Sequence, residues 1–263
     1  MADNKIWIDK NILEWDTSSG GGDILSKQDK DRAYDIWKHA AVLIDTAQNS
    51  FNLADGIANL KRSLNQRLKL IEEIYQLKTI NFPNKPKGYL ELLEVFGIVR
   101  PYIMKQLLEI RNDIEHRDST PPNKMRCSEL VDVVWYFLKS TDSFVLVKKS
   151  ELNFSLLDNV NSSNYWFSID WNFEDAKSSS FRGWFPEEYI STQKVEEFIE
   201  ITYEAYHNKE VWVEKISNTE LIKKSLIQDR IKTKLPTDLF ISGKINLESI
   251  NVGSVVNMVL TSI

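Results

Sequence analysis

The stretch Asp31-Arg-Ala-Tyr-Asp-Ile-Trp-Lys-His-Ala-Ala-Val-Leu-Ile-Asp45 decides the fold of the first half of the chain. Its apolar side chains recur at steps of three and four residues, the spacing that places them on one face of an amphipathic helix. These positions are Ala33, Ile36, Trp37, Ala40, Ala41 and Ile44, with Ala47 just beyond them. The pattern predicts a helix over 31–51 that buries this face against other helices.

Three more helical regions follow, at residues 53–80, 89–116 and 127–140, with apolar side chains at the same steps. Turn-forming residues at 81–88 and 119–123 separate them. Pro101 lies inside the third region and is expected to end or kink it at Arg100. Four helices with short polar joints predict a helical bundle, preceded by a polar, glycine-punctuated lead-in at 17–23.

The apolar period changes from helical to strand-like after residue 150. Phe167, Ile169, Trp171 and Phe173 alternate with polar residues, which indicates a half-buried strand over 165–173. We also expect helices at 193–207 and 218–227, and short strands at 211–213, 244–247 and 255–260. The predicted fold class is α+β: residues 1–150 form an N-terminal all-α bundle, and residues 151–263 form a small α+β domain.

The composition of the 263 residues excludes several classes of protein. Hydrophobic residues make up 42% and charged residues 27%, as in ordinary globular chains rather than disordered ones. The single cysteine, Cys127, excludes an intrachain disulfide and a multi-cysteine metal site. No apolar run reaches the roughly 18 residues of a membrane span, and the first residues lack the pattern of a signal peptide. We therefore expect a soluble, cytoplasmic protein.

The net charge of −5 is unevenly distributed along the chain. Residues 1–150 carry 22 Lys and Arg against 21 Asp and Glu, whereas residues 151–263 carry 11 against 17. An acidic second half binds nucleic acid poorly, because the phosphates are repelled by its carboxylates. Any contact with a polyanion is therefore expected in the first half.

One polar stretch, Glu109-Ile-Arg-Asn-Asp-Ile-Glu-His-Arg-Asp118, stands out at the end of the third helical region. Arg111 is followed directly by Asn112 and, after four intervening residues, by His116. This pattern resembles the signature of the HEPN superfamily of helical ribonucleases, which is an arginine, four to six residues and a histidine. The resemblance covers about residues 30–150 and none of the rest. It implies a HEPN-like bundle that cleaves RNA as a homodimer, without a metal or other cofactor.

The chemistry implied by this resemblance uses two copies of the motif. Asn112 and His116 share one helix face, whereas Arg111 lies about 140° around the helix from His116, so one copy makes a poor site. Across a dimer, two His116 side chains would supply the base for the RNA 2′-hydroxyl and the acid for the leaving oxygen. Arg111 would bind the phosphate, and Asn112 would bind the phosphate or orient His116. Lys124 and Arg126, just beyond the motif, are expected to hold the RNA backbone.

The biological role implied by the resemblance is that of a toxin or antiphage defence effector, with an antitoxin or regulatory protein as a possible further partner. The acidic domain 151–263 would then sense a trigger or restrain the nuclease. Two alternatives remain open. In the first, the bundle is a non-catalytic HEPN-like module that dimerises and binds RNA or protein, with Arg111 paired to Glu115. In the second, the aromatic residues Trp166, Trp171, Trp184 and Phe185 form a ligand pocket rather than core.

The remaining candidates have plainer interpretations. His39 is expected to be a partly buried structural residue, His207 to cap the helix at 193–207, and Cys127 to be small and buried. The three histidines have no metal-ligand spacing, so we predict no zinc site. A basic cluster is interpreted as a solvated helix face, with RNA contact as the alternative; it comprises Lys61, Arg62, Arg67 and Lys69.

Overall fold

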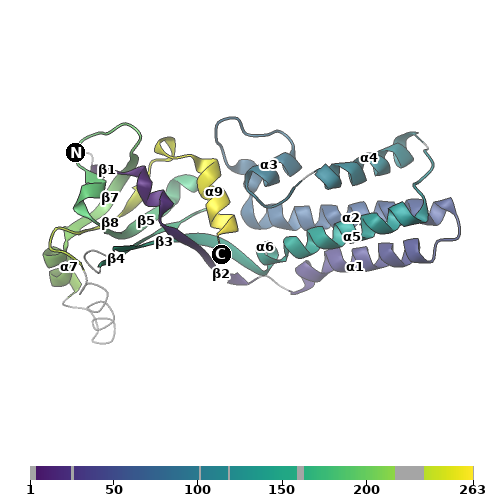
Figure 1. Cartoon of the computed structure of the whole chain (residues 1–263), viewed down its shortest axis with the longest axis horizontal. Helices are drawn as coiled ribbons and strands as arrows, with labels where there is room; N and C mark the ends of the chain where they lie inside the picture. The colour runs from purple at the N-terminus through teal and green to yellow at the C-terminus, as the bar shows by residue number, and fades with distance from the viewer. Residues whose placement is uncertain are drawn as a thin grey trace. The chain divides into compact units, whose positions relative to one another are not determined.

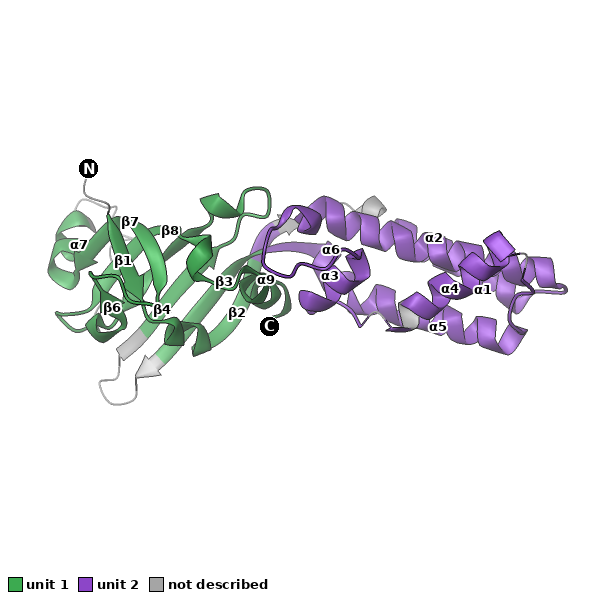
Figure 2. Cartoon of the chain, turned by 90° about the horizontal axis from the view of Figure 1, so that it is seen from above, with its two compact units in different colours: residues 1–20, 150–263 green, residues 21–149 purple. Residues whose placement is uncertain are grey.

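The computed structural model of the chain describes residues 4–24, 27–100, 102–117, 119–158, 163–216 and 234–262. The chain divides into two compact units, one formed by residues 1–20 with 150–263 and the other by residues 21–149 (Figure 2). The chain leaves the first unit within strand β2 (Asp16–Ile24) and re-enters it within strand β3 (Val147–Asp158). The helical unit is therefore an insertion into the other unit.

The helical unit contains six α-helices, at α1 (Lys27–Asp45), α2 (Ser50–Tyr75), α3 (Tyr89–Val95), α4 (Tyr102–Arg117), α5 (Lys124–Ser140) and α6 (Asp142–Leu146). Figure 1 shows α1, α2 and α5 running alongside one another, with α4 against α2. The side chain of Asn49 caps α2 by accepting a hydrogen bond from the backbone of Asn52, and Asn123 caps α5 in the same way through Arg126. These caps begin the helices where the apolar period begins.

The apolar stripe within residues 33–44 lies on the contact face of α1, although the helix predicted over 31–51 already ends at Asp45 and α2 begins at Ser50. Ala33, Ala40 and Ile44 are buried, whereas Asp31 and Lys38 on other faces are exposed. The opposing core comes mainly from α2 and α5, through Ile57, Leu60, Leu64, Ile71, Leu130, Val134, Phe137 and Leu138. The predicted region 89–116 is interrupted, as expected, but α3 ends at Val95, before the predicted break at Arg100, because Gly97 adopts a left-handed conformation (φ 70°).

The other unit is built on one eight-stranded sheet. Its remaining strands are β1 (Lys5–Ile8), β4 (Ser163–Asp170), β5 (Ser180–Phe185), β6 (Ile190–Ser191), β7 (Ile199–Asn208) and β8 (Leu239–Ile245). The strand order is β2-β3-β4-β5-β8-β7-β1-β6, and each strand pair whose register is described is antiparallel. Helices α7 (Lys209–Ile216) and α9 (Val252–Thr261) also belong to the described part of this unit. The Ser19 hydroxyl donates to the Ser262 carbonyl and so joins β2 to the end of α9.

Aromatic side chains fill the core of this sheet unit. Phe154 of β3 stacks on Phe167 of β4, with ring centroids 4.2 Å apart. Opposite Phe167 in the register stands Gly183, where an added Cβ would come within 2.2 Å of the Phe167 Cβ. Only glycine fits there. The predicted inward positions of residues 165–173 are confirmed, although the strand itself ends at Asp170.

The predicted order of an all-α bundle followed by an α+β domain is wrong, because the chain begins with strands. β1 and the glycine-containing β2 precede α1, and both belong to the sheet. β1 is four residues long, too short to show a convincing alternation, although Ile6 and Ile8 are both buried. The polar lead-in at 17–23 lies within β2. This strand pairs through its backbone, so its side chains show no strand pattern in the sequence.

Three predicted elements of the second half are also wrong. The predicted helix at 193–207 is mostly β7, in which Ile199 and Ile201 pair with β1, and Ile201 also pairs with Ile245 of β8. The predicted strands at 211–213 and 255–260 lie in helices α7 and α9, since short apolar runs do not distinguish strand from helix. The predicted strand at 244–247 overlaps only the last two residues of β8, and the predicted helix at 218–227 lies outside the described residues. None of the described helices is long and apolar enough to cross a membrane.

Candidate functional site

The three residues of the Arg–His motif lie in the last two turns of α4. Arg111 is half-buried, whereas Asn112 and His116 are exposed. Arg111 donates a hydrogen bond from Nη1 to the Asn112 Oδ1 over 3.2 Å. Each copy of the chain thus joins Arg111 to Asn112 and leaves the imidazole of His116 open to solvent.

A second cation lies beside Arg111. Burial lowers the pKa of Lys61 on α2, and the positive charge of Arg111 lowers it further. The packing of α2 against α4 therefore brings the charge of Arg111 to bear on Lys61. Such a pair of like charges favours a bound anion, because an anion between them removes the repulsion.

The end of α4 carries one further charged pair. Arg117 forms an ion pair with Asp113 one turn earlier, with 3.0 Å between Nη1 and Oδ1. The side chain of Glu115, the suggested partner of Arg111, lies outside the described residues. His116 stands in the last turn of α4, next to Arg117.

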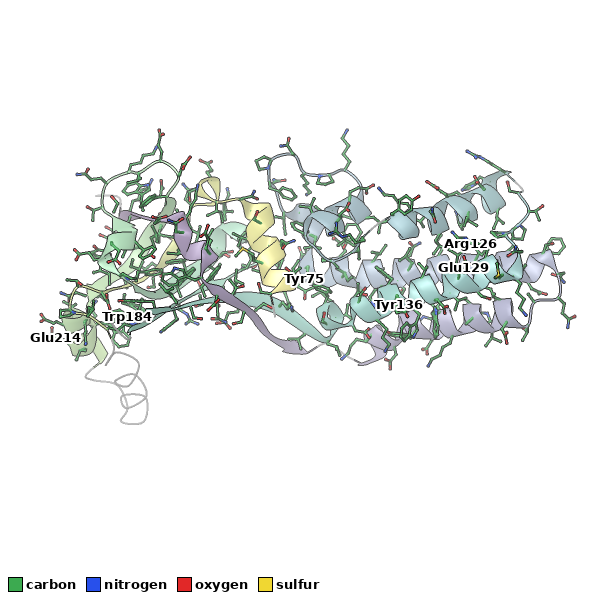
Figure 3. The ribbon with its side chains drawn as sticks, viewed as in Figure 1. Tyr75, Arg126, Glu129, Tyr136, Trp184 and Glu214 are labelled. Atoms are coloured by element: carbon green, nitrogen blue, oxygen red, sulfur yellow. The ribbon has the colours of Figure 1, made fainter. Side chains whose placement is uncertain are left out.

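Lys124 and Arg126, predicted to bind RNA, both have partners within the chain. Lys124 Nζ donates to the carbonyl of Asp45 at the end of α1. Arg126 forms an ion pair with Glu129 over 2.6 Å and donates to Gln106 of α4 over 3.1 Å; Figure 3 shows Arg126 and Glu129 side by side. A phosphate would have to compete with Glu129 for Arg126. Lys61 is therefore the better candidate for a phosphate contact.

The basic cluster of α2 is not a uniformly solvated face, because Arg67 is completely buried. Its Nη1 lies 3.0 Å from Asp142 Oδ1 and also donates to the Leu138 carbonyl and the Thr141 hydroxyl. Lys69 is exposed and pairs with Glu73 over 3.3 Å. Arg67 therefore belongs to the core of the helical unit, where it ties α2 to the α5–α6 junction.

The other single residues are settled by their surroundings. His39 is exposed, contrary to the prediction of a partly buried residue. His207 lies in β7 with its Nε2 2.7 Å from Lys215 Nζ, so it caps no helix there. Cys127 is buried as predicted, and burial raises the pKa of its thiol.

Trp171, Trp184 and Phe185 are buried in the sheet unit, which confirms the core interpretation of those aromatics. Within the described residues, no cluster of His, Cys, Asp or Glu could hold a metal ion.

The sheet unit contains a buried lysine that the sequence does not indicate. Lys234 is 3% exposed, and its Nζ lies 4.5 Å from the ring centroid of Tyr165. Burial lowers the pKa of Lys234 to about 8, against the opposing charge of Asp238. Asp238 accepts hydrogen bonds from the Tyr165 hydroxyl and the Leu235 backbone. No motif or spacing in the sequence marks this lysine, because its environment is assembled from β4 and the residues before β8.

We expect this lysine to make folding stability rise with pH. A lysine in the unfolded chain has a pKa of about 10.4, so between about pH 8 and 10 the unfolded chain holds a proton that the folded chain has released. Stability therefore increases as the pH rises through this window. Relative to Lys234→Met, the wild type should gain about 1–2 kcal/mol between pH 7.5 and 9.5 in urea unfolding. The exposed Lys244→Met is the matched control, and an equal change in both variants would contradict the assignment.

Comparisons with family models, with curated proteins and with solved structures find no match to this chain.

Proposed function

We propose that the protein is a metal-independent endoribonuclease of HEPN type that works as a homodimer. The observation that supports it best is that the charge of Arg111 acts on Lys61, while His116 stands further along the same helix as Arg111. Two cationic groups for phosphate and an exposed imidazole are then contributed by α2 and α4, which pack against each other. These are the two functions that cleavage through a 2′-hydroxyl requires.

The reaction needs two proton-transfer groups. The 2′-oxygen attacks phosphorus as one imidazole takes its proton, and the 5′-oxygen leaves as a second imidazole donates a proton. His116 lies on α4, whereas the other two histidines of the chain, His39 and His207, lie on α1 and β7. A second copy of the motif supplies the second imidazole. Arg111 and Lys61 would hold the phosphate and stabilise the charge on its oxygens.

The proposed biological setting is a toxin or antiphage effector, cytoplasmic, with an antitoxin or regulatory protein as partner. The sheet unit would carry the sensing or restraining role, in keeping with the acidic balance of residues 151–263.

The test is cleavage of a mixed RNA pool in EDTA by the wild type and by His116→Ala. Cleavage by the wild type alone supports the proposal, and equal cleavage by both proteins contradicts the site. If both proteins bind RNA as dimers and neither cleaves it, the second candidate, a non-catalytic dimeric RNA-binding module, is favoured. The hydrogen bond from Arg111 to Asn112, which occupies the arginine within its own chain, is the observation in favour of that candidate.

Lys61 provides a second, independent prediction for RNA binding. In the His116→Ala background, Lys61→Gln should weaken RNA binding to a similar extent for all sequences, because a lysine–phosphate contact does not distinguish bases. The slope of log K against log salt should fall by roughly 0.7, the value for one phosphate contact on a single strand. Fluorescence anisotropy at several salt concentrations measures both quantities. Lys69→Gln, on the same helix, is the control, and an unchanged slope for Lys61→Gln would remove Lys61 from the site.

A further inference from the structure

The helical unit contains a pocket of about 760 Å³ between α1, α5 and α6. It lies apart from the α4 motif: Trp135 in its wall is nine residues along α5 from Arg126, a rise of about 14 Å. Figure 3 shows Arg126 and Tyr136 well separated along the same helix. A volume of this size is within the range of small-molecule sites.

Three aromatic side chains, Tyr34, Trp37 and Trp135, line this pocket. The Tyr34 hydroxyl donates to Asp142 Oδ2 over 2.8 Å, and Trp37 Nε1 donates to the Val131 carbonyl over 2.9 Å. These two hydrogen bonds fix the orientation of both rings. The aromatic walls are therefore held in place before any ligand binds.

The carboxylate of Asp142 also lines the pocket, and Tyr34 and Arg67 fix its position. Asp142 accepts the hydrogen bond of Tyr34 on one oxygen and pairs with the fully buried Arg67 on the other, over 3.0 Å. The guanidinium carbon of Arg67 lies 5.5 Å from the Tyr34 ring centroid, so arginine, tyrosine and aspartate form one network. This network places a negative group and an aromatic face side by side.

A cation already occupies this arrangement, and it belongs to the protein. The ammonium of Lys139 lies 5.1 Å from the ring centroid of Tyr34 and 5.8 Å from that of Trp135. It also lies 3.7 Å from Asp142 Oδ2. Two aromatic faces and a carboxylate around one ammonium are the elements by which proteins bind organic cations. The pocket is thus built to stabilise an ammonium group.

The charged residues at the rim of the pocket do not favour an anion. Asp31 and Asp35 stand beside Lys30 and Lys38, so the rim is balanced. An anion entering the pocket would face Asp142 and the negative faces of the rings, whereas a cation meets groups that already hold one. The side chain of Lys139 is 51% exposed, so it can move into solvent without breaking a core contact.

We propose that this pocket binds an organic ammonium ion, which enters by displacing the ammonium of Lys139. Lys139 then acts as an internal occupant that competes with the ligand. The exchange leaves the net charge of the pocket unchanged, because one cation replaces another over the same rings. The site does not depend on RNA cleavage, since it shares no residue with the α4 motif.

The test uses tetramethylammonium as the probe and ligand-observed NMR titration of the full chain. Lys139→Met removes the internal competitor, so it should bind the probe about tenfold more tightly than the wild type. Lys38→Met removes the same charge from the same pocket but leaves Lys139 over the rings, and it should bind as the wild type does. Adding Trp135→Leu to Lys139→Met should abolish the gain.

Neutral tert-butanol, which has a similar shape, is the control for simple apolar binding. The proposal is overturned if Lys139→Met binds the probe no more tightly than the wild type, or if it binds tert-butanol equally well. The comparison of wild type with Lys139→Met decides the matter even if the tryptophan variant fails to fold, because the exposed lysine side chain packs in no core.

Discussion

Replacing His116 by alanine should lower the rate of RNA cleavage in EDTA by about 100-fold or more. A positioned acid or base contributes about 10²–10⁴-fold to such a reaction, and in a homodimer the substitution removes both imidazoles at once. His116 is exposed and makes no contact in the core of the helical unit, so its loss should leave the fold intact. The rate is measured on a mixed RNA pool under single-turnover conditions.

The matched control is His39→Ala, which removes another exposed histidine from the same helical unit. Its cleavage rate should equal that of the wild type. The wild-type rate should also depend on pH as a bell, because one imidazole must be neutral and the other protonated. A loss of activity in both histidine variants, or a rate that requires added divalent metal, would contradict the assignment.

Replacing Asp142 by alanine should lower the free energy of unfolding by about 3–5 kcal/mol. The substitution leaves the charge of Arg67 buried without its carboxylate, and an uncompensated buried charge costs about this much. Arg67 is fully buried, and its Nε and Nη2 already have no hydrogen-bond partner among the described residues. The measurement is urea unfolding followed by far-UV circular dichroism.

Two comparisons separate this effect from a simple loss of packing. Asp132→Ala, at an exposed position of α5, should change stability by less than about 0.5 kcal/mol. Arg67→Met combined with Asp142→Ala should cost less than Asp142→Ala alone, because no buried charge remains. Equal losses in the double and single variants would show that Arg67 is not the source of the penalty.

The helices of residues 27–140 could be predicted from the sequence because their signal is local. Ala33, Ala40 and Ile44 recur at the helical period, and asparagine caps and turn-forming residues mark where the helices begin and end. The placement of Arg111, Asn112 and His116 on one helix followed from the same reasoning. The neighbours of these residues could not be predicted in this way. The charge of Arg111 acts on Lys61 only because α2 packs on α4.

The strands were harder to predict because their partners are distant in the sequence. β1 pairs with β7, nearly two hundred residues away, and a four-residue segment carries too few positions to show its period. A helix was expected at 193–207, whereas pairing with β1 and β8 on both sides makes residues 199–208 a central strand. Propensity was overridden there by pairing.

The sequence by itself determined that most of residues 27–140 are helical, which residues form the Arg–His motif and that Cys127 is buried, because each follows from local period or composition. Only the tertiary structure decided that the helical unit is inserted into a sheet that the first strands begin. It also decided that Arg67 is a core residue and that Lys139 lies over two aromatic rings. The reason is physical: burial and the partners of a charge depend on which distant segments pack against it, and the periodicity of one segment does not contain that information.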